Sequence, residues 1–156
     1  MLRARAEAGS AVVDVPTGVE EILSAGLTVD GDRLVLKHFI GGSHVGEAQL
    51  DDVGFEAFVN HLHVDATSVA DAVLRGIAAL GALSELLLRD GDRPCRVILS
   101  IDDGVDHLKA EPMLEDVPPS AGLRFHAIRE GQEWLLPDLE SYREALMVVD
   151  VVPVRP

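Results

Sequence analysis

The sequence predicts an α+β fold in which a mostly antiparallel sheet packs on one long, largely buried central helix, with shorter helices around it. Three observations lead to this prediction. Residues 67–89 carry apolar side chains around most of a helix about six turns long. Strand-like segments flank this helix, and an Asp-Gly pair typical of a hairpin turn joins two of them. The order of strands and helices lacks regular βαβ alternation, which favours an antiparallel sheet.

The length of 156 residues is enough for one domain with a core of its own. Residues 1–16 show no periodicity and end at a proline, so we expect a flexible N-terminal arm followed by a single domain over 17–156. The single cysteine, Cys95, excludes an internal disulfide framework, and we expect a cytoplasmic protein.

The segment before the long helix contains four predicted elements. Thr17 is expected to cap a short helix over 19–26. Residues 27–39 alternate in polarity on either side of Asp-Gly and predict a hairpin, and 44–50 predict a further strand. Asp51 is expected to cap an amphipathic helix, because apolar residues follow it at the i, i+3, i+4, i+7 spacing.

The long helix should begin at a cap provided by Asp65 or Thr67. Its charged side chains form one narrow stripe that we expect to lie in water. That stripe consists of Asp71, Arg75, Ala78, Ala82, Glu85 and Arg89. Residues 69–88 are long enough to span a membrane, but two oppositely charged pairs spaced i, i+4 on this stripe indicate a buried helix of a soluble protein.

Strands dominate the prediction after the long helix. Residues 96–101 form a nearly continuous apolar run, which is typical of an interior strand. Residues 123–128 and 133–136 flank Glu130-Gly131 and predict a second hairpin, and Asp138 is expected to cap a last helix. A β-branched run over 147–154 predicts a final strand, at a sheet edge because it contains a proline.

The net charge of −14 bears on the class of partner. A chain without a basic patch is repelled by DNA, RNA and anionic lipid, so we expect neither direct nucleic-acid binding nor membrane binding. Six carboxylates and one lysine lie between residues 101 and 116, and such an acidic rim favours docking to a basic protein surface. The candidate partner-binding carboxylates are Asp102, Asp103, Asp106, Glu111, Glu115 and Asp116.

The segment His61, Leu62, His63, Val64, Asp65 is the candidate metal site. On a strand the two imidazoles and the carboxylate would share one face, and they are ligands that zinc accepts. The pattern resembles the histidine-rich signature of metallo-β-lactamase-like hydrolases, although Ala66 stands where that signature has a further ligand. The helical pattern that ends at Leu62 instead predicts a helix end, with His61 and His63 on different faces.

Two other segments fit non-catalytic interpretations better. The glycine-rich loop 41–46 is followed by Glu47 where a phosphate-binding loop needs Lys, so it is interpreted as a turn in which His44 contacts a partner. Cys95 enters a predicted strand, where a lone cysteine is typically a small buried apolar residue.

We therefore predict a small acidic non-catalytic protein-binding module of inhibitor, immunity or chaperone type that engages a basic partner protein and uses no cofactor. Homodimerisation is expected if part of the apolar face of the long helix stays uncovered. The alternative prediction is a small metal-assisted hydrolase that uses His61, His63 and Asp65.

Overall fold

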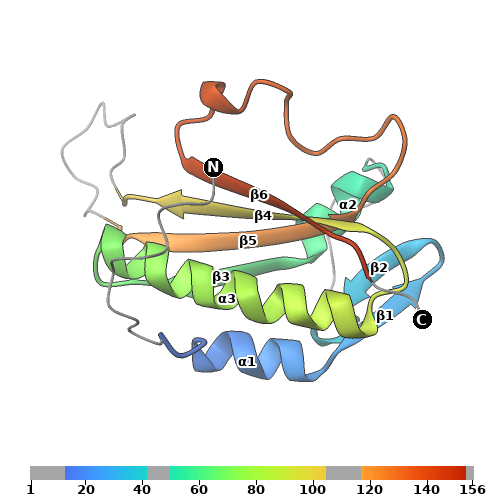
Figure 1. Ribbon diagram of the computed structural model, residues 1–156, viewed down its shortest axis with the longest axis horizontal. Coiled ribbons are helices and arrows are strands. Elements are labelled where there is room, and N and C mark those ends of the chain that lie inside the picture. The colour runs from blue at the N-terminus through green and yellow to red at the C-terminus, as the bar shows by residue number, and fades with distance from the viewer. Residues whose placement is uncertain (1–12, 42–49, 105–116, 154–156) are drawn as a thin grey trace.

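A computed structural model describes residues 13–41, 50–104 and 117–153 of the chain. Its helices and strands confirm the predicted α+β class (Figure 1). In chain order they are α1 (Thr17–Ser24), β1 (Leu27–Asp30), β2 (Arg33–Leu36), the 3-10 turn η1 (Lys37–Phe39), α2 (Asp52–Val59), β3 (His61–Asp65), α3 (Val69–Asp90), β4 (Cys95–Asp102), β5 (Ser120–Ala127), the 3-10 turn η3 (Leu139–Ser141) and β6 (Ala145–Val151).

The main sheet has four strands in the order β3-β5-β4-β6, and every neighbouring pair is antiparallel. Because β3 and β4 both run opposite to β5, they are parallel to each other, and α3 carries the chain across β5 between them. Figure 1 shows α3 lying along one face of the sheet, with α1 beside it on the β3 side. The β1-β2 hairpin forms a separate two-stranded sheet.

The core lies between α3 and the sheet, and it is mainly aliphatic. Leu83 and Leu87 of α3 are fully buried against inward-facing residues of the strands, among them Leu99 and Leu123. Gly76 marks the closest approach of the helix to the sheet. A Cβ at this position would lie 2.9 Å from Cδ1 of Leu99 and 3.0 Å from Cβ of Ala121. The missing side chain therefore sets how near α3 lies to the sheet.

The exposed part of α3 is wider than the charged stripe that the sequence predicts in water. Besides Glu85 and Arg89, a set of apolar side chains on its solvent side is 37–49% exposed. This set, called the outer stripe below, consists of Val69, Val73, Leu74, Ile77 and Leu88. The helix thus has two apolar faces, and only one of them belongs to the core.

A buried carboxylate holds the hairpin to the main sheet. Glu56 of α2 is fully buried and accepts hydrogen bonds from the backbone N–H of Leu34 at 2.6 Å and of Ala127 at 2.7 Å. Both terminal nitrogens of Arg129 also donate to this carboxylate, at 2.7 and 2.8 Å. The hydrogen bond with Glu56 raises the pKa of the Arg129 guanidinium. The side chain of Asn60 adds bonds to Leu36 N and Leu34 O.

Most predicted elements of the first half are confirmed, but only one of their three predicted caps is. The hairpin is present as β1 and β2, and Asp51 caps α2 by accepting a hydrogen bond from Gly54 N at 2.7 Å. The prediction of Thr17 as a cap is wrong, because Thr17 already lies in the first turn and Pro16 is the N-cap. The prediction of Asp65 or Thr67 as the cap of α3 is also wrong, because the N-cap is Ser68, whose hydroxyl accepts from Asp71 N.

The second half departs from the prediction where pairing in the sheet overrides local patterns. The strand over 96–101 is confirmed as the interior strand β4, and the last strand is confirmed as the edge strand β6. The hairpin arm over 133–136 is absent, because both edges of β5 are already paired with β3 and β4. The helix after Asp138 is only the turn η3, because Ala145 and the residues after it pair with β4.

The strand predicted over 44–50 lies outside the described residues, apart from Leu50. So do residues 1–12 of the expected N-terminal arm, whereas Val15 packs against the core.

We predict that the two interior glycines of α3 respond oppositely to alanine. Gly76→Ala should lower the free energy of unfolding by about 1–3 kcal/mol, because the new methyl group overpacks the contact with the sheet. Gly81→Ala should raise it by up to about 1 kcal/mol, because its Cβ meets nothing within 4 Å and alanine favours the helix. Urea denaturation of both variants measures this difference, and equal stabilisation by both would contradict the close approach at Gly76.

A second prediction concerns the buried carboxylate. Glu56→Gln should lower the free energy of unfolding by about 3–5 kcal/mol, because it leaves Arg129 partly buried without its carboxylate. The matched control is Glu133→Gln, which removes a largely exposed partner of Arg96 and should change stability by at most about 1 kcal/mol. Thermal and urea unfolding measure both values. Similar small losses of unfolding free energy in the two variants would show that the Glu56 carboxylate contributes little to stability.

Candidate functional site

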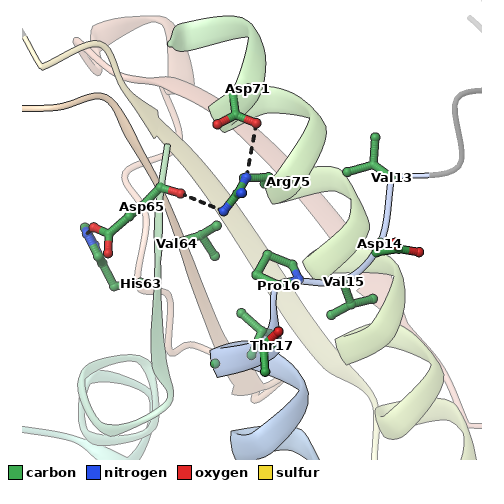
Figure 2. Close-up of a pocket in the computed structure, with 12 residues that line it drawn as sticks. Val13, Asp14, Val15, Pro16, Thr17, His63, Val64, Asp65, Asp71 and Arg75 are labelled. Carbon is green, nitrogen blue, oxygen red and sulfur yellow. Dashed lines mark hydrogen bonds and ion pairs between the residues drawn. The ribbon is translucent and has the colours of Figure 1, made fainter. Parts of the chain in front are cut away.

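A pocket of about 570 Å³ opens where the N-terminal segment, β3 and the first turns of α3 meet. It is lined by residues 13–19, by the end of β3 from His63 to Asp65, and by Asp71 and Arg75 of α3. Figure 2 shows Arg75 and Val64 between the helix and the strand, and the side chains of His63 and Asp65 on the other side of the strand. A volume of this size is within the range of sites that hold a side chain or a small ligand.

Arg75 links the helix to the end of β3. Its Nε donates to Asp71 at 3.1 Å, and its Nη1 donates to the carbonyl oxygen of Asp65 at 3.3 Å (Figure 2). Asp71 also accepts from the backbone N–H and the hydroxyl of Thr67. The hydrogen bond from the Thr67 backbone is the main reason that the pKa of Asp71 is lowered, so this carboxylate stays ionised.

The pocket is net acidic. Asp14 and Asp71 contribute two carboxylates to its lining, and Arg75 contributes one permanent positive charge. His63 and Asp65 line it from β3, but their side chains point away from α3, with His63 Nε2 3.1 Å from Oδ1 of Asp65. A lining with this balance attracts a cation such as an ammonium or guanidinium group.

The outer stripe starts at the same turns of α3 that contribute Asp71 and Arg75 to the pocket. Val69, Val73 and Leu74 are each about half exposed and occupy the solvent side of these turns. An apolar strip beside a charged pocket is the composition expected of a protein-binding surface, where apolar contacts supply affinity and charges supply selectivity.

The predicted acidic rim falls partly at this end of the sheet. Asp65 and Asp102 both pair with Ser120 across β5, so their Cα atoms lie about 10 Å apart, given the usual spacing between strands. Asp102 accepts a hydrogen bond from Gly104 N at 2.9 Å and so closes the turn after β4, with Asp103 beside it. The other predicted partner-binding residues, His44, Asp106, Glu111, Glu115 and Asp116, lie outside the described residues.

The prediction that a helix end places His61 and His63 on different faces is wrong. Helix α2 ends at Val59, and buried Asn60 turns the chain into β3, whose Leu62 pairs with Leu123. On this strand His61, His63 and Asp65 all point away from α3, since Leu62 and Val64 face the core. Across residues 13–41, 50–104 and 117–153, no three His, Cys, Asp or Glu side chains come together closely enough to hold a metal ion.

His61 lies in an electropositive and partly desolvated place. Burial lowers its pKa to about 4, and the charges of Arg124 and His63 act in the same direction. The imidazole is therefore neutral at pH 7 and can accept or donate a hydrogen bond.

Cys95 is not a nucleophile in this structure. Its side chain is fully buried, and burial raises the pKa of the thiol to about 12, so the reactive thiolate does not form at neutral pH. The sequence interpretation of a buried structural cysteine agrees with this environment.

The sequence patterns predict neither the pocket nor the outer stripe of α3. The residues of the pocket come from three segments that only the tertiary fold brings together. Asp71 and Arg75 had a signal in their i, i+4 spacing, but that spacing predicts a surface ion pair and gives no indication of a cavity beside it.

The fold and this site define a small acidic α+β domain with an exposed apolar helix face next to a negatively charged pocket. The chain belongs to the Uncharacterized protein PM0498 family, whose model matches residues 3–155. No curated protein and no solved structure matches the chain. Within the part that the structure describes, none of the helices combines the length and the apolar character needed to cross a membrane.

We predict that His61 makes stability depend on pH. Its folded pKa lies below the unfolded value of 6.5, so the unfolded chain binds more protons between about pH 6.5 and pH 4. The contribution of neutral His61 to stability is complete above this window and is lost as the pH falls through it. NMR titration should place the His61 midpoint near 4, and His61→Gln should flatten the stability profile in this range. An unshifted midpoint would contradict the desolvated environment.

Proposed function

We propose that the protein is a non-catalytic protein-binding module of inhibitor, immunity or chaperone type, and that it binds a basic partner protein with the outer stripe of α3 and the acidic pocket. The observation that carries this proposal is the outer stripe itself. Five apolar side chains lie 37–49% exposed along one helix, although the opposite face of the same helix is buried in the core.

Exposed apolar side chains in a row along one helix face are characteristic of contact surfaces. A small monomeric domain seldom keeps such a row in water, because each side chain gains free energy when it is covered. The stripe presents Val73, Leu74 and Ile77 at i, i+1 and i+4, the spacing that a groove or a second helix contacts in a partner.

The charges beside the stripe decide which partner fits. Asp14 and Asp71 line the pocket, and Asp65 and Asp102 lie at the same end of the sheet, in a chain whose net charge is −14. A lysine or arginine side chain of the partner can enter the pocket and lie near these carboxylates while the apolar part of the partner covers the stripe. Opposite net charge also accelerates association and makes it sensitive to salt.

A second copy of the chain is the competing occupant of the outer stripe. Pairing two stripes would bring two acidic pockets and two strongly negative chains close together, which opposes association at low salt. Charge therefore favours a basic partner over homodimerisation at this surface.

The metal-assisted hydrolase remains a prediction of the sequence. The shared face of His61, His63 and Asp65 satisfies its first geometric requirement. In the described part of the chain, however, no three carboxylate, thiol or imidazole groups, these three included, lie close enough together to hold a metal ion.

The test is affinity capture from the native cell with wild-type protein and with the variant Leu74→Gln/Ile77→Gln. We expect the wild type to retain a protein of basic isoelectric point, at low salt more than at high salt. The variant should bind the purified partner at least about tenfold more weakly, because truncating central apolar contacts removes more than about 1 kcal/mol each.

The matched control is Leu136→Gln/Leu139→Gln, which makes the same chemical change at two exposed leucines of the segment before β6. It should retain the partner with unchanged affinity. Equal loss in both variants, or a partner that is not basic, would overturn the proposal. Light scattering that shows a wild-type dimer, converted to monomer by the α3 variant, would assign the outer stripe to a second copy instead.

A further inference from the structure

The strand β6 forms one edge of the main sheet, where it pairs with β4 along one side (Figure 1). Along its other side, no backbone hydrogen bond joins β6 to residues 13–41, 50–104 or 117–153, a set that includes the segment leading into β6. In an edge strand every second residue directs its N–H and C=O groups outward. The outer edge of β6 therefore presents a row of donors and acceptors that a further strand can pair.

The sequence of β6 lacks lysine and proline, the residues that edge strands commonly use to avoid pairing. Its seven residues are Ala-Leu-Met-Val-Val-Asp-Val, and Pro153 lies beyond its end. The ladder with β4 runs without a bulge from Ala145 to Val151, so the strand is regular over its whole length. Such an edge is suited to accept another strand.

On the side of α3, apolar side chains border this edge. Met147 lies opposite Leu99 in the β4-β6 ladder, so both side chains are on the face where Leu99 meets α3 at Gly76. On the helix, Arg75 and Ile77 are turned from Gly76 by about 100° in opposite directions. Arg75 reaches β3, so Ile77 lies on the flank toward β6. Ile77 and Met147 are 46% and 45% exposed, and both are accessible to a strand added at β6.

On the opposite face, acidic side chains border β6. Asp150 and Glu133 both contact the guanidinium of Arg96, each at 2.8 Å, and their side chains are 45% and 59% exposed. One cation thus faces two carboxylates, which leaves net negative charge beside the strand. A strand that fits this edge has apolar side chains toward α3 and basic side chains toward the other face, and the two-residue period of a strand provides this alternation.

We propose that the basic partner binds by adding a β-strand of alternating apolar and basic residues to the outer edge of β6. The backbone of this strand pairs with the edge, its apolar side chains cover Ile77 and Met147, and its basic side chains lie near Asp150 and Glu133. The inference rests on the proposed function, and it specifies how the partner meets the outer stripe, to which Ile77 belongs. A second β6 is a poorer match, because it carries no basic residue and belongs to a chain of net charge −14.

The probe is a capped peptide of alternating valine and lysine, as long as β6, titrated into full-length protein and followed by NMR amide hydrogen exchange. At saturation, exchange of alternate β6 amides should slow at least about tenfold, because they become hydrogen-bonded to the added strand. The same peptide N-methylated at every residue keeps the side chains and the charge but cannot donate backbone hydrogen bonds, and it should not slow the exchange. Unchanged exchange with the first peptide, or equal slowing with both, would overturn the proposal.

A variant and a matched control place the peptide on the protein. Met147→Gln should weaken peptide binding about fivefold or more, because it removes an apolar contact in the middle of the added strand. The control Val29→Gln makes a comparable change in β1, where Val29 is 47% exposed, and it should leave the affinity unchanged. Equal weakening in the two variants would show binding that is not specific to β6 and would overturn the proposal.

Strand addition and the proposed function can fail separately. Weaker capture of the partner by Leu74→Gln/Ile77→Gln, without slower exchange in β6 when the partner binds, would overturn strand addition and leave the proposed function standing. Slower exchange in β6 together with unchanged capture by that variant would support strand addition and overturn the proposed role of the outer stripe. A dimer in light scattering whose β6 amides exchange slowly without peptide would assign the edge to a second copy and overturn the proposal.

Discussion

The carboxylate of Glu56 connects parts of the structure that no sheet pairing joins. The β1-β2 hairpin shares no strand ladder with the four-stranded sheet, so its backbone needs another source of hydrogen bonds. The Glu56 carboxylate accepts a hydrogen bond from Leu34 N of the hairpin and another from Ala127 N of β5, while Arg129 neutralises its charge. Because a buried charge is tolerated only when it is paired and hydrogen-bonded, this arrangement fixes α2, the hairpin and the end of β5 relative to one another.

The two sides of the four-stranded sheet differ in chemistry, because α3 covers only one of its faces. On the side of α3, close packing at Gly76 brings the helix down onto β4 and β5, and its outer stripe remains in water above an acidic pocket. On the other side, the sheet presents the pair of histidines from β3 and the guanidinium of Arg124, which donates to the carbonyl oxygen of Ala57. The second surface therefore carries imidazole and guanidinium groups in a protein whose net charge is −14.

The sequence predicts the fold class and most strands, because the long helix, the Asp-Gly hairpin and the apolar run of β4 are local patterns. It fails where a partner elsewhere in the chain decides the outcome. Residues after Asp138 have a helical pattern, yet Ala145 pairs with Ile101 and the chain becomes a strand. The pattern before His63 suggested a helix end, but β5 draws the segment into the sheet. The apolar pattern of α3 likewise does not indicate which face of the helix the sheet will cover, so the outer stripe can be identified only in the tertiary structure.

The position of β5 has a consequence for the order of events during synthesis. This strand lies between β3 and β4, although it follows both in the chain, and Ala127 and Arg129 complete the bonds of Glu56. When β3, α3 and β4 have left the ribosome, the place between the two strands is still empty and the buried carboxylate has no counterion. The first hundred residues therefore cannot reach their native arrangement alone, and the domain closes late, once β5 arrives and pairs on both edges.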